Sequence, residues 1–385
     1  MISKNRKIIS IFLMICIFMT CFSLTIYTEP NNSGMNFDCK SAILMEADSG
    51  TILFEQNADE ALPPASVTKV MTLLLVMEAI AQNKLSLTDM VTASAHACSM
   101  GGSQIYLEEG EQMSVEDMLK SVVIASANDA AVALAEHIAG TEEAFVALMN
   151  KRAEELGMKN THFENTNGLD DSVENHVTSA RDIAIMSAEL ISHKKILEYS
   201  SIWMDTIRNG EFGLTNTNRL VRFYKGANGL KTGSTSKAKF CISATAERKG
   251  MTLICVVMAA STRDIRNATA TALLDWGFAN FDMYNAPSIE IDPIKVVGGV
   301  KNSCKVEESV FKTVVDKANV SKIKYNIKLP QNLSAPIKKG DKVGSIEYYL
   351  EDKLIGNSDV FASEEIDKMS FGYLFFNFLA RISLM

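Results

Sequence analysis

The chain has 385 residues and a mass of 42.2 kDa, more than one average domain needs and enough for two. Hydrophobic residues make up 47% and charged residues 22% of it, a globular composition that excludes wholesale disorder. The formal net charge is −8 with no basic stripe, which argues against nucleic acid as a partner. The mean hydropathy of +0.06 is high for a soluble protein, and much of the apolar excess lies at the two ends.

The N-terminal end has the pattern of an export signal. A basic cluster at Lys4, Arg6 and Lys7 precedes residues 8–27, which carry no charge. We therefore expect residues 1–28 to be a signal peptide and the protein to be exported to the outer face of the cytoplasmic membrane or the cell wall. An uncleaved membrane anchor stays open, because the run can span a bilayer and no clear Ala-x-Ala site follows it.

The region after the signal alternates strand and helix patterns. Two apolar runs within residues 41–54, separated by the turn signal Asp48-Ser49-Gly50, predict a β-hairpin. A second hairpin is predicted where residues 240–246 and 252–260 flank Arg248-Lys249-Gly250. Helical spacing predicts the remaining elements: residues 66–81 after Pro63-Pro64, 130–139, a helix capped by Thr141, 181–190 and 262–278.

Beyond Pro287 the pattern changes to short alternating strands broken by Gly, Pro and Asn. It predicts a small all-β domain over residues 287–366. The predicted strands are residues 289–297, 309–315, 323–329 and 343–350.

The last segment, residues 369–385, is mostly apolar, and Arg381 is its single charge. Ser370, Asn377 and Arg381 fall on one narrow stripe of a helix, so we expect an amphipathic tail that lies in the membrane interface. A terminal helix packed on the protein's own core is the alternative.

The cysteines do not form a disulfide framework. Of seven, Cys16 and Cys21 lie in the predicted signal, and an odd, widely scattered number is left. Cys241 and Cys255 can face each other across the second hairpin, and a bridge between them is a minor alternative. No Cys or His spacing matches a zinc site.

Three short motifs carry chemistry when they are taken together. In Ser66-Val67-Thr68-Lys69, at the start of the first strong helix, the lysine lies one turn from the serine hydroxyl and can take its proton if its own pKa is lowered. This pattern alone is weak, because Ser-x-x-Lys occurs six times and a serine there can be a plain N-cap. Ser126-Ala127-Asn128 precedes a helix. Lys231-Thr232-Gly233 precedes the second hairpin, and its glycine allows the backbone of a ligand to approach a strand closely.

With these motifs the sequence resembles the active-site serine penicillin-recognising enzymes. It is most similar to the low-molecular-weight penicillin-binding proteins that act as D-alanyl-D-alanine carboxypeptidases. The resemblance covers about residues 41–281 and rests on these segments: residues 64–72, 126–131, 167–169, 176–182 and 229–235. It implies an α/β (α+β) fold: a β-lactamase/transpeptidase-like catalytic domain over residues 38–283, with an antiparallel sheet and a helical lobe, followed by the small all-β domain.

The resemblance also implies catalytic roles for three side chains. Ser66 would attack the carbonyl of the penultimate D-Ala, form an acyl-enzyme and release D-Ala. Lys69 would be the general base, and Ser126 would pass a proton to the leaving amine. Two lysines in one cleft repel each other, which lowers the pKa of the better buried one and favours Lys69 as a neutral base.

Substrate binding would fall to the remaining motif residues. Asn128 would position Lys69 and the substrate amide. Lys231 would supply positive charge for the terminal carboxylate, and Thr232 a hydroxyl bond to it. The expected partners are peptidoglycan stem peptides ending in D-Ala-D-Ala, β-lactam antibiotics as acylating inhibitors, and a membrane surface; neither a metal nor a cofactor is expected.

The oxyanion would be held by the backbone N–H groups of Ser66 and of Ser234, the residue after Gly233. Two positions depart from related patterns. The family often has a glycine near the position of Lys239, in the strand after Lys231-Thr232-Gly233, so Ala238-Lys239 puts close contact there in doubt. Ala127 stands where class A β-lactamases typically have Asp, which favours the carboxypeptidase.

Three other functions remain open at this point. A β-lactamase would need a deacylating carboxylate, and Glu164-Asn165-Thr166-Asn167 superficially offers one. A cell-wall binding scaffold would keep the fold without catalysis, although it would not need the pair of Ser66 and Lys69. A transpeptidase would pass the acyl group to an amine instead of water.

Overall fold

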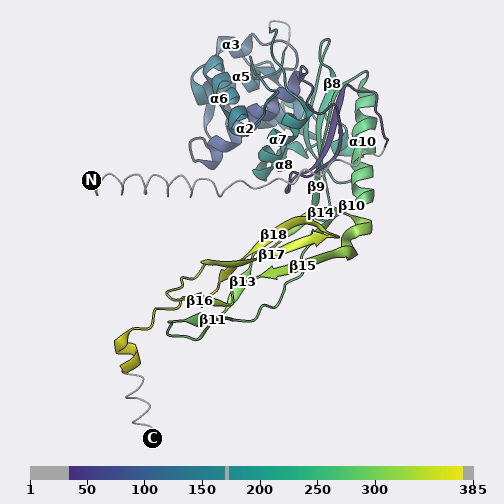
Figure 1. Ribbon diagram of the computed structural model, residues 1–385. Coiled ribbons are helices and arrows are strands. Elements are labelled where there is room, and N and C mark those ends of the chain that lie inside the picture. The colour runs from purple at the N-terminus through teal and green to yellow at the C-terminus, as the bar shows by residue number, and fades with distance from the viewer. Residues whose placement is uncertain (1–33, 170–172, 376–385) are drawn as a thin grey trace, which may run out of the picture.

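The computed structural model describes residues 34–169 and 173–375. A mixed α/β part stands above an elongated β part (Figure 1). The centre of the α/β part is an antiparallel five-stranded sheet in the order β2-β1-β9-β8-β7. Its strands are β1 (Ser41–Glu46), β2 (Ile52–Gln56), β7 (Ala227–Thr235), β8 (Lys239–Arg248) and β9 (Met251–Ala260). Both predicted hairpins are therefore present, and β7, which carries the Lys231 motif, lies at one edge.

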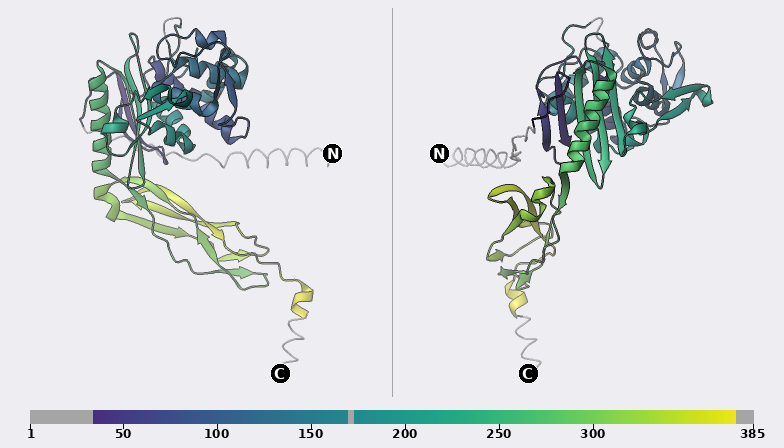
Figure 2. Two further views of the ribbon diagram at one scale, coloured as in Figure 1. Left: turned by 180° about the vertical axis from the view of Figure 1, so that it is seen from behind. Right: turned by 90° about the vertical axis from the view of Figure 1, so that its right-hand side faces the viewer.

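Helices cover both faces of this sheet (Figure 2). α10 (Arg263–Asn280) packs against β8 and β9 on one face. α7 (Ala180–Ser192) packs against β9 and β1 on the other face, and α2 (Lys69–Ala81) packs against α7. The helical lobe beyond α2 contains α3 (Ala95–Cys98), α4 (Val115–Lys120), η2 (Ser121–Ala125), α5 (Asn128–Ala139) and α6 (Glu142–Glu155).

The smaller elements of the α/β part connect these layers. Two short antiparallel hairpins pair β3 with β4 and β5 with β6. Their bounds, with those of the short helices, are β3 (Met90–Thr92), β4 (Gln112–Ser114), α8 (Lys195–Ser200), β5 (Met204–Ile207), η3 (Arg208–Gly210), β6 (Phe212–Thr215) and α9 (Leu220–Phe223).

The predicted helices are present, with one difference at the start of the first. The α-helix begins at Lys69, and the turn before it, η1 (Ala65–Thr68), is a 3₁₀ helix. A 3₁₀ turn is common at the end of an α-helix. Here the 3₁₀ turn begins at Ala65, which has a left-handed φ of 49°. Thr141 caps α6 as predicted, because its side chain accepts a hydrogen bond from the N–H of Ala144.

Three small sheets make up the C-terminal β part. A four-stranded sheet has the order β13-β18-β17-β15, a three-stranded sheet has the order β12-β11-β16, and β10 pairs with β14. The elements are β10 (Phe281–Asn285), β11 (Ile294–Val297), β12 (Ser303–Cys304), β13 (Val306–Glu308), β14 (Lys312–Asp316), η4 (Lys317–Lys322), β15 (Ile323–Lys328), β16 (Asn332–Ser334), β17 (Lys342–Leu350) and β18 (Lys353–Ala362).

Two strand predictions in this part need correction. The strand predicted over residues 289–297 exists only as β11, because Pro293 has no N–H to donate to a ladder. The strand predicted over residues 309–315 begins later, at Lys312. β18 was not predicted, since Gly356 and Asn357 interrupt its alternating pattern.

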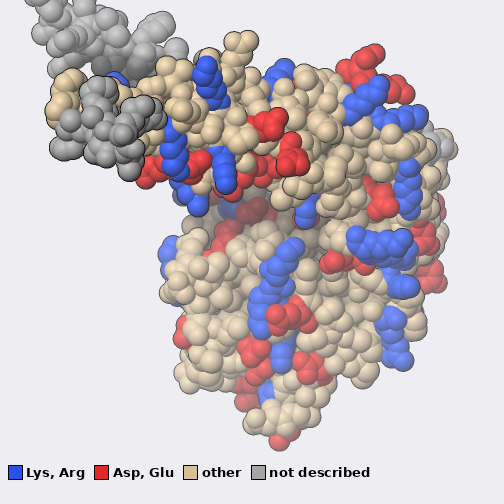
Figure 3. Space-filling view, turned by 90° about the horizontal axis from the view of Figure 1, so that it is seen from below, with Lys and Arg blue, Asp and Glu red and all other residues tan. Residues whose placement is uncertain are grey.

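The two parts have separate cores. In the α/β part, apolar side chains fill both faces of the sheet. In the β part the ring of Phe311 stacks on the buried Tyr348 with centroids 4.2 Å apart. Viewed from below, a recess separates the two parts, and acidic and basic side chains are interleaved on this face (Figure 3). The connection runs through α10 and the pairing of β10 with β14.

Some predictions concern the ends and the cysteines. The signal over residues 1–28 lies outside the described residues, as do residues 376–385 of the tail. Residues 371–375 are helical and exposed, and no helix within the described ranges is long and apolar enough to cross a membrane. The minor alternative of a disulfide between Cys241 and Cys255 is wrong, because both thiols are free and the strand register places Cys255 opposite Ala244.

Candidate active site

The predicted nucleophile lies on a tightly held turn. Ser66 follows Ala65, whose left-handed φ of 49° is rare for a residue with a side chain and is typical of a constrained functional site. The Thr68 hydroxyl donates to the Ala65 carbonyl at 2.8 Å, and His176 Nε2 lies 2.7 Å from the same hydroxyl. Since His176 Nδ1 accepts from the Glu164 N–H at 2.9 Å, its Nε2 carries the proton and donates to Thr68.

A backbone contact closes the turn from the other side. A Cβ on Gly168 would lie 1.9 Å from the Ala65 carbonyl oxygen, so only glycine fits there. Gly233 on β7 is also too close to the turn to carry a side chain, because a Cβ there would lie 2.7 Å from the Ser66 nitrogen. The turn is therefore clamped between the loop of residues 164–169 and the edge strand.

Lys69, the first residue of α2, is completely buried and has three polar neighbours. Its Nζ lies 3.0 Å from Ser66 Oγ, 2.5 Å from Asn128 Oδ1 and 2.8 Å from the backbone oxygen of Asn167. The orientation of the Asn128 amide is set by its Nδ2, which donates to the Gly101 carbonyl at 2.6 Å. A neutral amine has two N–H groups, which the two carbonyl oxygens take, so its lone pair faces the Ser66 hydroxyl.

Ser126 and Lys231 form the second half of the site. η2 ends at Ala125, and the next residue, Ser126, has a left-handed φ of 65° and directs its hydroxyl toward Lys231 of β7. Lys231 Nζ donates to Ser126 Oγ and to the Thr232 carbonyl, each at 2.9 Å. The Thr232 hydroxyl donates to the Thr217 hydroxyl at 2.8 Å. The structure thus brings together Lys231 and Ser126, which are far apart in the sequence.

Burial shifts the pKa of both lysines downward. Desolvation lowers the pKa of Lys69 well below its ordinary value, and the charge of Lys231 adds to this effect. Desolvation and then the charge of Arg266 lower the pKa of Lys231 to about 7. Near neutral pH this arrangement favours a neutral Lys69, as the sequence predicted.

These groups open onto a cleft of about 660 Å³. Predicted site residues line it together with residues that sequence reasoning missed. The predicted residues in the lining are Ser66, Ser126, Thr232, Gly233 and Ser234, and the residues missed are Trp203, Thr217, Arg219, Arg263 and Arg266. Lys231 is not among the lining residues and lies beneath them.

The missed arginines belong to segments without a motif. Arg266 is 3% exposed, and its guanidinium donates to Asn267 Oδ1 and to the Cys241 carbonyl. Burial is the main cause that lowers its pKa to about 10. Arg263 and Arg266 stand in the first turn of α10, where the helix dipole disfavours cations. That unfavourable placement was the signal available in the sequence.

The carboxylate that a β-lactamase would need does not line the cleft. Glu164 Oε2 accepts from the Asn175 N–H at 3.0 Å, so the side chain is directed along its own loop. Glu164 contributes to the site only through its backbone N–H, which fixes the tautomer of His176.

Two family models match this chain. Residues 27–262 match the Peptidase S11 model, described as D-alanyl-D-alanine carboxypeptidase. Residues 282–368 match the model of the penicillin-binding protein 5 C-terminal domain.

Similar proteins cover most of the chain. D-alanyl-D-alanine carboxypeptidase DacF of Bacillus subtilis is 40% identical over 369 residues, which is 93% of this chain and 94% of that protein. DacC of Escherichia coli is 35% identical, with 92% and 91% covered.

Solved structures agree. Penicillin binding protein 5 from Haemophilus influenzae has a TM-score of 0.76 at 35% identity and covers 87% of this chain and 99% of its own. Penicillin-binding protein D2 from Listeria monocytogenes, solved in an ampicillin-bound form, has a TM-score of 0.59 at 34% identity and covers 63% and 99%.

Proposed function

This chain belongs to the D-alanyl-D-alanine carboxypeptidase family of low-molecular-weight penicillin-binding proteins, and on that premise we propose how its residues divide the reaction. It is a serine D-Ala-D-Ala carboxypeptidase that binds β-lactams. Its catalytic domain spans residues 38–283, and a β domain spans residues 287–366.

Acylation begins at Ser66. Its Oγ attacks the carbonyl carbon of the penultimate D-Ala, and its proton passes to the lone pair of Lys69 Nζ, 3.0 Å away. The backbone N–H groups of Ser66 and Ser234 stabilise the negative charge that develops on the carbonyl oxygen. The close approach of Gly233 to the Ser66 nitrogen supports this pairing of donors.

Departure of the terminal D-Ala needs a proton on its nitrogen. As the C–N bond breaks, Ser126 Oγ gives its proton to the leaving amine and is reprotonated by Lys231 Nζ, 2.9 Å away. The proton that Lys69 took from Ser66 then restores Lys231, so both lysines return to their starting states. Water attacks the ester carbonyl and Lys69 accepts its proton. Lys69 passes this proton to Ser66 Oγ as the ester C–O bond breaks and the shortened peptide leaves.

The terminal carboxylate is bound on the side of the cleft that holds Thr232. Lys231 is buried beneath the cleft lining, so it acts on the carboxylate by its charge. Direct contact falls to the Thr232 hydroxyl, which turns its proton from Thr217 to the carboxylate, with Arg266 as a nearby cation of the cleft lining.

The observation that carries these assignments is the set of three contacts of Lys69 Nζ, which leaves its lone pair facing Ser66. Mass spectrometry after exposure to benzylpenicillin tests it: we expect one penicilloyl adduct, on Ser66. Ser66→Ala should remove the adduct, whereas Ser236→Ala, at an exposed serine in another Ser-x-x-Lys pattern, should keep it. An adduct on another residue, or none, would overturn the assignment.

We further propose that the protein is exported, with residues 1–28 as its signal, and that residues 369–385 hold it at the membrane surface. Support comes from the exposed apolar side chains of the described part of this tail, such as Phe371, which is 83% exposed. Flotation with anionic vesicles tests the attachment: the full chain should float, and a chain ending at residue 368 should not. Equal flotation of both would contradict it.

A further inference from the structure

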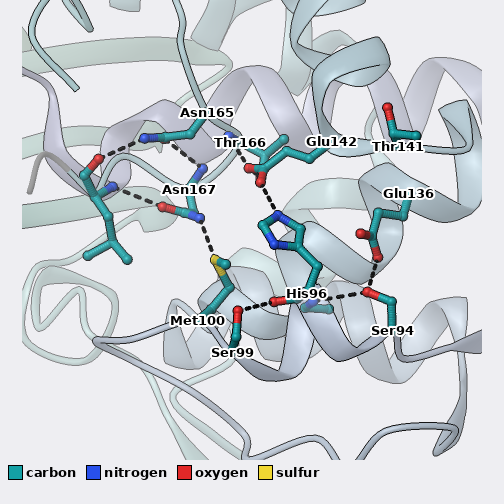
Figure 4. A network of polar contacts seen from close by, with 12 residues as sticks. Ser94, His96, Ser99, Met100, Glu136, Thr141, Glu142, Asn165, Thr166 and Asn167 are labelled. Carbon is teal, nitrogen blue, oxygen red and sulfur yellow. Dashed lines mark hydrogen bonds and ion pairs between the residues drawn. The ribbon is translucent and has the colours of Figure 1, made fainter. Parts of the chain in front are cut away.

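A carboxylate outside the cleft links three segments of the helical lobe (Figure 4). Glu142 is the first residue of α6, and its side chain is 12% exposed. Its Oε2 lies 2.7 Å from His96 Nε2 in α3. Its Oε1 accepts two hydrogen bonds from Thr166, from the backbone N–H at 3.0 Å and from the hydroxyl at 2.8 Å.

The loop that Glu142 holds is the one that reaches Lys69. The Thr166 carbonyl accepts from the Thr72 hydroxyl at 2.6 Å, one turn along α2 from Lys69. The next carbonyl, that of Asn167, accepts from Lys69 Nζ at 2.8 Å. Two consecutive carbonyl groups therefore dock on α2, and Glu142 binds Thr166, which carries the first of them, through its N–H and its hydroxyl.

The loop is also braced internally. Asn165 Oδ1 accepts from the Gly168 N–H at 2.7 Å, and Asn165 Nδ2 donates to the Leu169 carbonyl at 2.7 Å. Asn167 Nδ2 lies 3.5 Å from the sulfur of Met100 (Figure 4). These contacts shape the turn, whereas among the described residues the bonds to Glu142 and Thr72 tie Thr166 to α6 and α2.

The position of the Asn167 carbonyl matters because of what it does to the base. By accepting one N–H of neutral Lys69, it leaves the lone pair directed at Ser66 Oγ. A displaced carbonyl would let the amine rotate, and small displacements of reacting groups have large effects on rate.

We propose that Glu142 is a positioning residue for acylation, holding the Asn167 carbonyl against Lys69 through its bonds to Thr166 and His96. This rests on the proposed role of Lys69 as general base.

The charges around His96 strengthen its ion pair with Glu142. The pKa of His96 is raised, chiefly by the hydrogen bond to Glu142, while the charges of Glu142, Glu136 and Glu143 act in the same direction. Because the folded-state pKa is raised, the ion pair is complete at acid pH and is lost as pH rises through that raised value. The pair therefore persists at pH values where unperturbed histidine has lost its charge.

The test measures acylation by benzylpenicillin in the full chain. We expect Glu142→Ala to lower the first-order acylation rate constant by about tenfold to a hundredfold, with little change in the affinity of the complex formed before acylation. Glu142→Gln should recover much of the rate, because its amide oxygen can still accept from Thr166. Glu143→Ala is the matched control: it removes a fully exposed acid from the same helical turn. Glu143 has only a small effect on the pKa of His96. Its removal leaves the bonds of Glu142 to Thr166 and His96 in place, so the rate constant should stay close to that of the unsubstituted protein.

The fraction of Ser66 that is finally labelled distinguishes a positioning role of Glu142 from damage to the fold. A positioning residue lowers the rate constant while the fraction of Ser66 finally labelled stays complete, whereas misfolding lowers that fraction and leaves the rate constant of the remainder unchanged. If Glu142→Ala acylates as fast as Glu143→Ala, or only its labelled fraction falls, the proposal is overturned. Absence of a Ser66 adduct in the unsubstituted protein would instead contradict the proposed function.

A second variant tests the route through the loop. Thr166→Val removes the hydroxyl bond to Glu142 and keeps the backbone bond, so we expect a smaller decrease in the same rate constant. In the double variant with Glu142→Ala it should add nothing further, because both changes break the same link. Simple additivity of the two effects would contradict the proposed path.

Discussion

The two cleft lysines have different surroundings, and this difference separates their tasks. Lys69 faces two carbonyl oxygens and the Ser66 hydroxyl, an arrangement that suits a neutral amine. Lys231 faces the Ser126 hydroxyl and one carbonyl, and burial and the charge of Arg266 lower its pKa to about 7. The charge of Lys231 also acts to lower the pKa of Lys69, so we expect Lys69 to lose its proton first and Lys231 second as pH rises.

This order predicts a bell-shaped pH dependence for acylation by benzylpenicillin. The rate should rise as Lys69 becomes neutral and fall as Lys231 loses its charge near pH 7. Lys231→Arg should acylate more slowly, because a guanidinium does not give a proton to Ser126. Because the guanidinium keeps its charge, the remaining rate should show no falling limb. Lys237→Arg, at an exposed lysine just after the same strand, is the control and should keep it. An active Lys231→Arg variant with an unchanged falling limb would contradict the assignment.

Lys239, the position at which the sequence put close contact in doubt, has an unusual backbone conformation. It lies near the position where the resemblance implies a glycine, and it has a left-handed φ of 57° at the start of β8. This conformation strains a lysine, because a Cβ costs about 1–2 kcal/mol in this region.

We therefore predict that Lys239→Gly raises the free energy of unfolding by about 1 kcal/mol, measured by urea denaturation. Lys324→Gly, at an exposed lysine within β15, should instead lower it by roughly 0.5–1 kcal/mol, because there the added backbone freedom relieves no strain. Destabilisation by Lys239→Gly would show that its side chain contributes more than its backbone costs.

At the scale of elements, the site depends on segments that pack against the η1 turn. The Gly168 loop touches it on one side and the Gly233 strand on the other, each too closely for a side chain. The sequence predicted close approach at Gly233, but for a ligand. The structure shows that the protein's own nucleophile turn is what lies there.

Gly168→Ala tests this packing. The new methyl group would lie 1.9 Å from the Ala65 carbonyl, so we expect the loop or the turn to shift and acylation of Ser66 to fall at least tenfold. Gly157→Ala is matched in backbone strain, with a φ of 72°, but has open space around it. It should lose about 1–2 kcal/mol of stability and keep the acylation rate. Equal rates in both variants would show that the contact is dispensable.

Most elements were predictable because their signals are local. Caps such as Thr141 and turn signals such as Asp48-Ser49-Gly50 act on their own neighbours in the chain, and the structure has them where expected. β18 and the start of β11 were not, since strand pairing depends on partners that are distant in the sequence.

At the scale of the whole molecule, the β part has apolar clusters of its own, and the core of the α/β part extends only into the pair of β10 and β14, through Val314, Phe281 and Met283. We therefore expect the two parts to unfold separately. Ile346 is fully buried in the β part, and Leu73 is fully buried beside the catalytic helices. We predict that Ile346→Ala lowers the stability of the β part by about 2–5 kcal/mol and leaves acylation of Ser66 unchanged.

Leu73→Ala is the counterpart, with the same size of loss expected in the catalytic part, and it should also slow acylation. Differential scanning calorimetry and the acylation rate of both variants check this. A single transition that both substitutions shift equally would contradict the separation into two parts.

What the sequence determined by itself was the chemistry: a serine, two lysines and a second serine in recognisable local patterns, together with the order of most helices and hairpins. Such patterns can be recognised in the sequence because the residues of each single motif are neighbours or lie one helical turn apart. Only the tertiary structure decided which backbone carbonyl directs Lys69, which arginines line the cleft and that Glu142 holds the loop. A backbone carbonyl looks the same at every residue, and contacts between distant segments exist only once the chain has folded.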